Sequence, residues 1–175
     1  MNTIFPGNLA PTFSHKDLNE VHVSLRDFTG SKVLLSFFRD ASCPFCNMRL
    51  RELILNYHQF KHENIHVLAV FHSSKEEILV YAGKQEAPFS ILPDPTLNLY
   101  KIYGIETSTL GKFKTLISFP KIWKMMRSGF FNLESMASPN TLPADFLIGE
   151  SGKIEMAYYG KDFGDHIPLE LLFKS

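Results

Sequence analysis

The sequence predicts one α/β domain built as a three-layer sandwich around a central sheet. Two apolar runs, at residues 33–38 and 65–71, have the composition of buried strands. A helix signal follows each run: an apolar stripe after the first, and a serine with two glutamates after the second. Late in the chain, apolar segments flank a turn at residues 149–152, which is typical of a β-hairpin.

The bulk composition excludes several classes of protein. With 175 residues, the chain is long enough for a single domain with a substantial core. Its hydrophobic content is 45% and its formal net charge is zero, which argues against disorder and against a nucleic-acid partner. Residues 1–11 lack the pattern of a secretory signal, and no stretch has the roughly 20 apolar residues of a membrane span. We therefore expect a cytoplasmic protein.

The first half of the chain alternates strands and helices. Residues 1–32 form an irregular lead in which residues 21–25 alternate like a half-exposed strand. The strand at residues 33–38 leads into a helix from Pro44 to about residue 62, because apolar residues recur there every three or four positions. After the strand at residues 65–71, Ser73 or Ser74 caps a helix that reaches about Tyr81.

The second half of the chain completes the sheet. Residues 89–92 predict a short strand, and Asp94 starts a helix over residues 96–103. Residues 146–148 and 154–159 predict the hairpin, and a last helix, capped by Asp165, runs from about residue 167 to 173. Strand–helix–strand order early and an antiparallel hairpin late are the order of a thioredoxin fold.

A segment at about residues 106–140 interrupts this order. Its apolar residues predict one or two amphipathic helices on either side of Pro120. Trp123, Phe130 and Phe131 give the segment an apolar surface, flanked by basic residues. Three roles stay open for this helical insertion: packing on the domain's own core, a homodimer or partner contact, and contact with a membrane surface.

The two cysteines of the chain, Cys43 and Cys46, lie where the first strand becomes a helix. A thiol attacks as a thiolate, and a helix N-terminus lowers a thiol pKa through its free N–H groups and its dipole. Arg39, Arg49 and Arg51 lie close in sequence and add positive potential, which Asp40 opposes. With this spacing one sulfur attacks and the other resolves the mixed disulfide. We expect Cys43, at the exposed end of the turn, to attack and Cys46, one turn into the helix, to resolve.

Other interpretations of these residues stay open. The cysteines could be reduced core residues, or ligands of a zinc ion, although zinc needs four ligands and no second pair lies near them in sequence. We expect neither a metal nor a bound cofactor. The polar segment at residues 159–166 is either a substrate or partner contact, with His166 as a proton carrier, or a turn with Asp165 as a helix cap.

Several segments, in order, resemble the AhpC/TSA peroxiredoxins. The chain has an Ala-Pro-x-Phe opening at residues 7–13 and a Leu-x-x-Phe-x-Gly segment at residues 23–30. It also has a Phe-to-Asp segment with a Tyr-Gly pair at residues 88–105, and the hairpin at residues 143–154. It implies a thioredoxin fold and antioxidant chemistry on peroxides. It also implies a thiol electron donor, such as thioredoxin or glutathione.

The chain departs from the family's Pro-x-x-x-Thr/Ser-x-x-Cys motif. Cys46 takes the peroxidatic position, Cys43 replaces the threonine, and Arg39 replaces the proline. The family's peroxide-orienting arginine falls near Pro143, which instead resembles the cis-proline that holds substrate in thioredoxins. Residues 43–46 resemble the Cys-Pro-Tyr-Cys of glutaredoxins. We expect Arg39, Pro44 and Pro143 to bind substrate, and either cysteine could attack first, because peroxidase chemistry reverses the roles.

Two functions from different classes follow. The first is a thiol oxidoreductase that cycles a Cys43–Cys46 dithiol and disulfide to reduce disulfides or peroxides. The second is a non-catalytic thioredoxin-fold module that binds a partner through the helical insertion at residues 106–140. Thiols that react in the folded protein favour the first, and thiols that resist labelling favour the second.

Overall fold

The computed structural model describes residues 3–105 and 140–174. A five-stranded sheet has the order β5-β4-β3-β6-β7. The central strand β3 (Lys32–Phe38) pairs in parallel with β4 (Ile65–Phe71) and antiparallel with β6 (Ala144–Ile148). Strands β5 (Ser90–Pro93) and β7 (Ile154–Tyr159) complete the two sides of the sheet. The buried strands and the hairpin expected from the sequence are confirmed.

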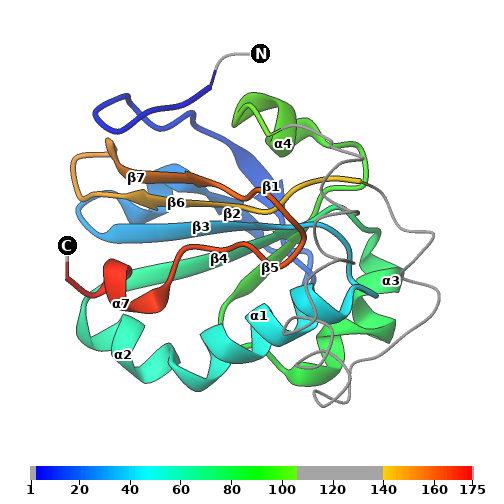
Figure 1. Ribbon diagram of the computed structural model, residues 1–175. Coiled ribbons are helices and arrows are strands. Elements are labelled where there is room, and N and C mark those ends of the chain that lie inside the picture. The colour runs from blue at the N-terminus through cyan, green and yellow to red at the C-terminus, as the bar shows by residue number, and fades with distance from the viewer. Residues whose placement is uncertain (1–2, 106–139, 175) are drawn as a thin grey trace.

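Helices lie on both faces of this sheet (Figure 1). One face packs against α1 (Pro44–Leu55), α2 (Tyr57–His62), α3 (Lys75–Val80) and α7 (Leu169–Leu172). The opposite face packs against α4 (Asn98–Ile102) and against a small hairpin of β1 (Ser14–Lys16) and β2 (His22–Ser24). The predicted three-layer α/β architecture is therefore confirmed.

Strand β3 is apolar throughout because both of its faces are covered. Leu35 and Phe37 belong to the core on the α4 side, where Phe37 contacts the ring of Tyr100. Leu34 and Phe38 belong to the core on the α1 side. Side chains alternate across a strand, so a continuous apolar run fills two cores at once.

Most of the expected helices form close to their predicted positions. The helix after the cysteines divides at Asn56 into α1 and α2, and its apolar stripe is buried. Ser74 caps α3 in a capping box with Glu77. The Asp94 carboxylate accepts hydrogen bonds from the first backbone N–H groups of α4. Asp94 therefore caps this helix, although Leu97 occupies the N-cap position in the backbone. Two short 3-10 helices, η1 (Leu25–Phe28) and η2 (Ala82–Gln85), complete the described elements.

Two predictions differ from the structure. The last helix is shorter than expected and Asp165 does not cap it: its carboxylate instead accepts from Tyr158 Oη and Lys161 N, and Pro168 holds the N-cap position. The strand expected at residues 21–25 ends at Ser24, which caps η1. The helical insertion at residues 106–140 lies, but for its last residue, outside the described residues. The described residues hold no candidate for a transmembrane helix, and α1, with 12 residues, is too short to be one.

Candidate active site

The two cysteines lie where β3 ends and α1 begins. Cys43 is the N-cap residue of α1, with an extended backbone, and Pro44 follows as the first helical residue. Both cysteines are free thiols, and both side chains are 0% exposed. Burial of Cys46 on the apolar stripe is confirmed, but the expected exposure of Cys43 is wrong. Cys43 N donates to Asp40 O at 3.3 Å, and this turn places the sulfur in the core beside Ala41.

A frame of hydrogen bonds fixes the turn. The buried amide of Asn47 donates to Ala41 O at 2.7 Å and to Cys43 O at 3.0 Å. Ser73 Oγ, from the segment after β4, accepts from Ala41 N at 3.0 Å. Asp40 Oδ1 accepts from Ser42 N at 2.8 Å. The turn is thus held by groups from α1 and from the end of β4, and the thiols occupy a defined position.

The Cys43 sulfur accepts hydrogen bonds that stabilise its thiolate. The Cys46 thiol is the largest influence and lowers the pKa of Cys43, burial opposes this, and the charge of Arg39 and nearby backbone N–H groups lower it further, to about 7. Arg39 Nη1 lies 3.5 Å from the sulfur. At pH 7 about half of Cys43 is then ionised, against a few per cent of an ordinary cysteine.

Cys46 has the opposite character. Burial raises its pKa well above the ordinary value, and the hydrogen bond and charge of the neighbouring Cys43 raise it further. The pair can therefore hold a single negative charge at neutral pH, and the lowered pKa of Cys43 favours that sulfur as its carrier. At neutral pH the Cys43 sulfur can act as a nucleophile, and the neighbouring Cys46 thiol keeps its proton and donates a hydrogen bond to it.

The remaining predicted site residues have different positions. Arg39 is buried beside Cys43, and its guanidinium carbon lies 4.0 Å from the centre of the Phe163 ring. Pro44 is buried at the start of α1. Pro143 precedes β6, and its carbonyl accepts from Gly160 N at 2.9 Å. No peptide bond of the described residues is cis, so Pro143 does not share the cis conformation of the thioredoxin proline that it resembles.

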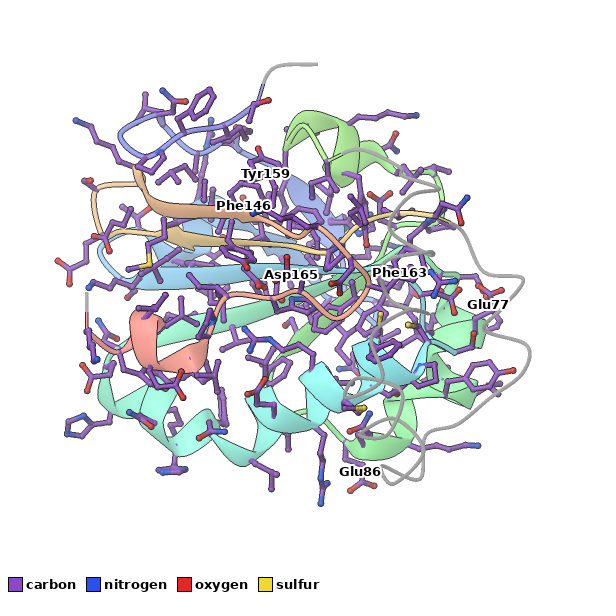
Figure 2. All side chains as sticks on the ribbon, in the orientation of Figure 1. Glu77, Glu86, Phe146, Tyr159, Phe163 and Asp165 are labelled. Carbon is purple, nitrogen blue, oxygen red and sulfur yellow. The ribbon has the colours of Figure 1, made fainter. Side chains whose placement is uncertain are left out.

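The loop between β7 and α7 packs against this turn, which the sequence did not predict. We name the loop, residues 160–168, the β7–α7 loop; Figure 2 shows Phe163 and Asp165 on it. Phe163 stacks on Arg39, and a Cβ placed on Gly164 would lie 3.2 Å from the Phe45 ring. The sequence signal for this contact was the presence of Gly160, Phe163 and Gly164 in one short segment, since glycine permits close approach of the backbone to other groups. We call Cys43, Cys46, Arg39 and Phe163 the thiol cluster.

A second polar cluster lies on the same side of the sheet. We call Asp145, His166, Arg49 and Ser36 the carboxylate cluster. Asp145, fully buried on β6, accepts from Ile167 N at 2.8 Å, and its Oδ2 lies 3.0 Å from His166 Nδ1 and 3.8 Å from Arg49 Nη2. Burial acts to raise the pKa of Asp145, but the charges of His166 and Arg49 and hydrogen bonds from His166 and Ser36 hold it below its usual range.

The carboxylate cluster gives His166 a fixed environment. Its ring is 4% exposed, and among the described residues its Nε2 has no hydrogen-bond partner. A role of His166 as proton carrier stays a prediction. Among the described residues, no group of three or more histidine, cysteine or acidic side chains is placed to hold a metal ion.

Comparisons with known proteins agree with this geometry. Residues 6–157 match the model of the AhpC/TSA family. Over 114 residues the chain is 31% identical to peroxiredoxin Bcp of Escherichia coli K12, an alignment that covers 64% of this chain and 73% of Bcp.

Solved structures of such proteins share the fold. A PrxQ mutant of Xylella fastidiosa superposes with a TM-score of 0.66 at 20% identity, covering 99% of this chain and 96% of that one. The peroxidoxin BcpB of Mycobacterium tuberculosis has a TM-score of 0.67 at 13% identity, covering 89% and 86%. The predicted thioredoxin-like fold is the fold of these structures.

Proposed function

The chain belongs to the AhpC/TSA family, and from this premise we propose that Cys43 and Cys46 work as one dithiol–disulfide pair. Its relatives include peroxiredoxins, and the protein is a thiol-dependent oxidoreductase of the peroxidase type. Family membership does not favour the non-catalytic binding module. The observation that carries the proposal is the different surroundings of the two buried sulfurs. The Cys46 thiol and Arg39, whose Nη1 lies 3.5 Å from the Cys43 sulfur, lower the pKa of Cys43, whereas burial raises the pKa of Cys46.

In the proposed reaction Cys43 attacks first. Its thiolate sulfur bonds to one peroxide oxygen, the O–O bond breaks, and the leaving oxygen takes a proton to become an alcohol or water. Cys43 is thereby oxidised to a sulfenic acid, and the peroxide is reduced by two electrons. Because Cys43 is buried, the turn must open locally for the substrate to reach the sulfur.

Cys46 then resolves the intermediate. It loses its proton and bonds to the Cys43 sulfur, the S–O bond breaks, and the oxygen leaves as water. With a disulfide as substrate, Cys43 instead forms a mixed disulfide and Cys46 releases the second substrate thiolate. Both routes end in a Cys43–Cys46 disulfide, so the two substrates differ only in the group that leaves.

The proposal extends to donors and to binding residues. A thiol donor returns the disulfide to two thiols, and thioredoxin or glutathione in the cytoplasm has the required chemistry. Arg39 stabilises the Cys43 thiolate, since its guanidinium lies beside the sulfur. Substrate contacts of Pro44 and Pro143, and a homodimer contact of the helical insertion, stay predictions.

A second assignment has its own support. On the family motif Cys46 stands at the peroxidatic position, so attack by Cys46 with resolution by Cys43 follows the sequence pattern. The elevated pKa of Cys46 opposes it, because little thiolate is present at neutral pH. The pKa difference leads us to prefer Cys43.

Two single-cysteine variants separate the assignments. We expect Cys43→Ser to lose rapid reaction with stoichiometric hydrogen peroxide, because the remaining thiol keeps its proton. We expect Cys46→Ser to react once and to accumulate a sulfenic acid, because the resolving thiol is gone. Stopped-flow peroxide consumption, with trapping of the sulfenic acid and mass spectrometry, measures both. Insulin reduction assayed alongside shows whether disulfides are also substrates.

The outcomes are distinct. Rapid sulfenic acid formation on Cys46 in the Cys43→Ser protein assigns the attack to Cys46 and overturns the proposed order. A protein in which neither variant reacts, while the wild type also fails to turn over peroxide and insulin, restores the binding-module hypothesis.

A further inference from the structure

We propose that Phe163 is a positioning residue: its ring holds the guanidinium of Arg39 against the sulfur of Cys43. The inference deepens the proposed function and rests on it, because it assigns to Phe163 control over the amount of the nucleophile. Phe163 is 120 positions from Cys43 in sequence, and only the fold brings the two residues to the same cluster.

The geometry fits one guanidinium between two different partners. A guanidinium presents N–H donors along its edge and a flat cationic face. An edge nitrogen, Nη1, lies 3.5 Å from the Cys43 sulfur. The central carbon lies 4.0 Å from the centre of the Phe163 ring, well within the range of a cation–π contact. Arg39 and Phe163 are each 4% exposed, so water weakens neither contact much.

Arg39 needs such support because its side chain is long. It directly follows β3, and an arginine side chain loses much rotamer freedom when it is fixed. A ring against the flat face restricts the plane of the guanidinium while leaving its edge donors available. Loss of the ring is therefore expected to move the cation from the sulfur without removing its charge.

The β7–α7 loop has features that fix Phe163 in place. On one side, a Cβ on Gly160 would collide with the backbone of Asp165 and with Pro143, so glycine permits the close approach of this strand end. On the other side, Ile167 N and the His166 ring bind the Asp145 carboxylate. Phe163 thus lies between two anchored points of the β7–α7 loop; Figure 2 labels Phe163 on this loop.

The other groups around the thiolate are accounted for. The Cys46 thiol and the backbone N–H groups of Cys46 and Phe45 also stabilise the thiolate. On the loop itself, Asp165 is bound by Tyr158 and Lys161, and His166 lies against Asp145. Asp162 Oδ1 accepts from Gly164 N. Asp40, next to Arg39, accepts from Ser42. Phe163 therefore acts on the thiol through Arg39.

The test is a thermodynamic cycle on the thiol titration. In the Cys46→Ser protein, where serine keeps a donor to Cys43, the ultraviolet absorbance of the thiolate is followed against pH. We expect Phe163→Leu to raise the midpoint by about half a pH unit, a roughly threefold loss of thiolate at pH 6. Phe163→Tyr keeps the ring face and is expected to keep the midpoint.

Combination with Arg39→Met makes the test specific. If Phe163 acts through Arg39, Phe163→Leu has no further effect on the midpoint in the Arg39→Met background. A merely structural role would shift the midpoint equally in both backgrounds, and that result, or an unchanged midpoint in the presence of Arg39, overturns the inference. Phe173→Leu, which removes an aromatic contact with Phe60 beside α7, is the matched control and is expected to leave the midpoint unchanged.

Failure of the inference and failure of the proposed function give different results. The titration reports the Cys43 thiol whether or not that thiol attacks first. If peroxide reacts at Cys46 while Phe163→Leu still shifts the Cys43 midpoint through Arg39, the positioning role stands and the order of attack is wrong. If Cys43 reacts first but the midpoint is insensitive to Phe163, the proposed order of attack stands and the positioning role of Phe163 is wrong.

Discussion

The thiol cluster and the carboxylate cluster each place a buried arginine near an acidic group on the same side of the sheet. In the thiol cluster, Arg39 lies beside a sulfur whose pKa is about 7. In the carboxylate cluster, Arg49 lies near Asp145, a carboxyl that is ionised at any physiological pH. A buried arginine therefore lies beside a thiol that titrates near neutral pH in one cluster, and beside a carboxylate that stays ionised in the other.

This difference separates reactivity from stability. Near pH 7 a small change in the pKa of Cys43 changes the fraction of nucleophile, and so the rate of attack. A similar change in the pKa of Asp145 leaves its charge unchanged. The loss of a partner there appears instead as a cost in folding free energy, because a buried charge is left unbalanced. We expect the thiol cluster to control chemistry and the carboxylate cluster to control stability.

The largest expected effect follows removal of the Asp145 charge. Asp145→Asn keeps the shape of the side chain but removes the buried anion that faces Arg49 and His166, so that Arg49 keeps only its ion pair with the half-exposed Glu52, at 2.8 Å. We expect a loss of about 3–5 kcal/mol in the free energy of unfolding, as for other broken buried ion pairs. Urea unfolding of the purified variant measures it.

The matched control is Asp165→Asn, which removes a half-buried carboxylate of the β7–α7 loop. Its loss of stability is expected to be smaller, since water can replace the missing partner. Equal losses in the two variants would show that burial of the carboxylate cluster is not what makes Asp145 costly to remove.

The acid dependence of stability gives a second measure of the carboxylate cluster. The folded pKa of Asp145 lies below its unfolded value of about 3.9, so its stabilising contribution is complete above that pH and is lost as the pH falls towards the folded pKa. Below about pH 4, wild-type stability should decline by about 1.4 kcal/mol per pH unit more steeply than that of Asp145→Asn. Unfolding curves at several acidic pH values test this; parallel declines would contradict it.

The fold was predictable because its signals are local. The runs at residues 33–38 and 65–71 are apolar on both faces, and the Ser74–Glu77 capping box fixes the start of α3. The position of Cys43 and Cys46 at a helix start follows from the same local pattern. The predicted exposure of Cys43 is wrong, because the residue is fully buried in the core on the α1 side of the sheet.

The environment of the thiols was not predictable from one sequence. Phe163 reaches Arg39, and His166 reaches Asp145, only through the return of the chain after β7. Asp165 has the composition of a helix cap, yet its carboxylate binds Tyr158 and Lys161 within the preceding loop. Local rules identify a residue's options, and long-range packing selects among them.

The smallest expected effect tests how the β7–α7 loop joins the two clusters. In Gly164→Ala the new methyl group would lie 3.2 Å from the edge of the Phe45 ring, which is half-buried and can shift by a few tenths of an ångström. We expect a loss of stability of about 1 kcal/mol or less and a Cys43 midpoint within about 0.2 pH units of wild type. Gly160→Ala is the contrast, because its methyl group would meet backbone atoms that cannot yield, and its cost should reach about 2–3 kcal/mol. A large shift of the Cys43 midpoint in Gly164→Ala would mean that the contact between Gly164 and Phe45 also positions the β7–α7 loop relative to the thiols.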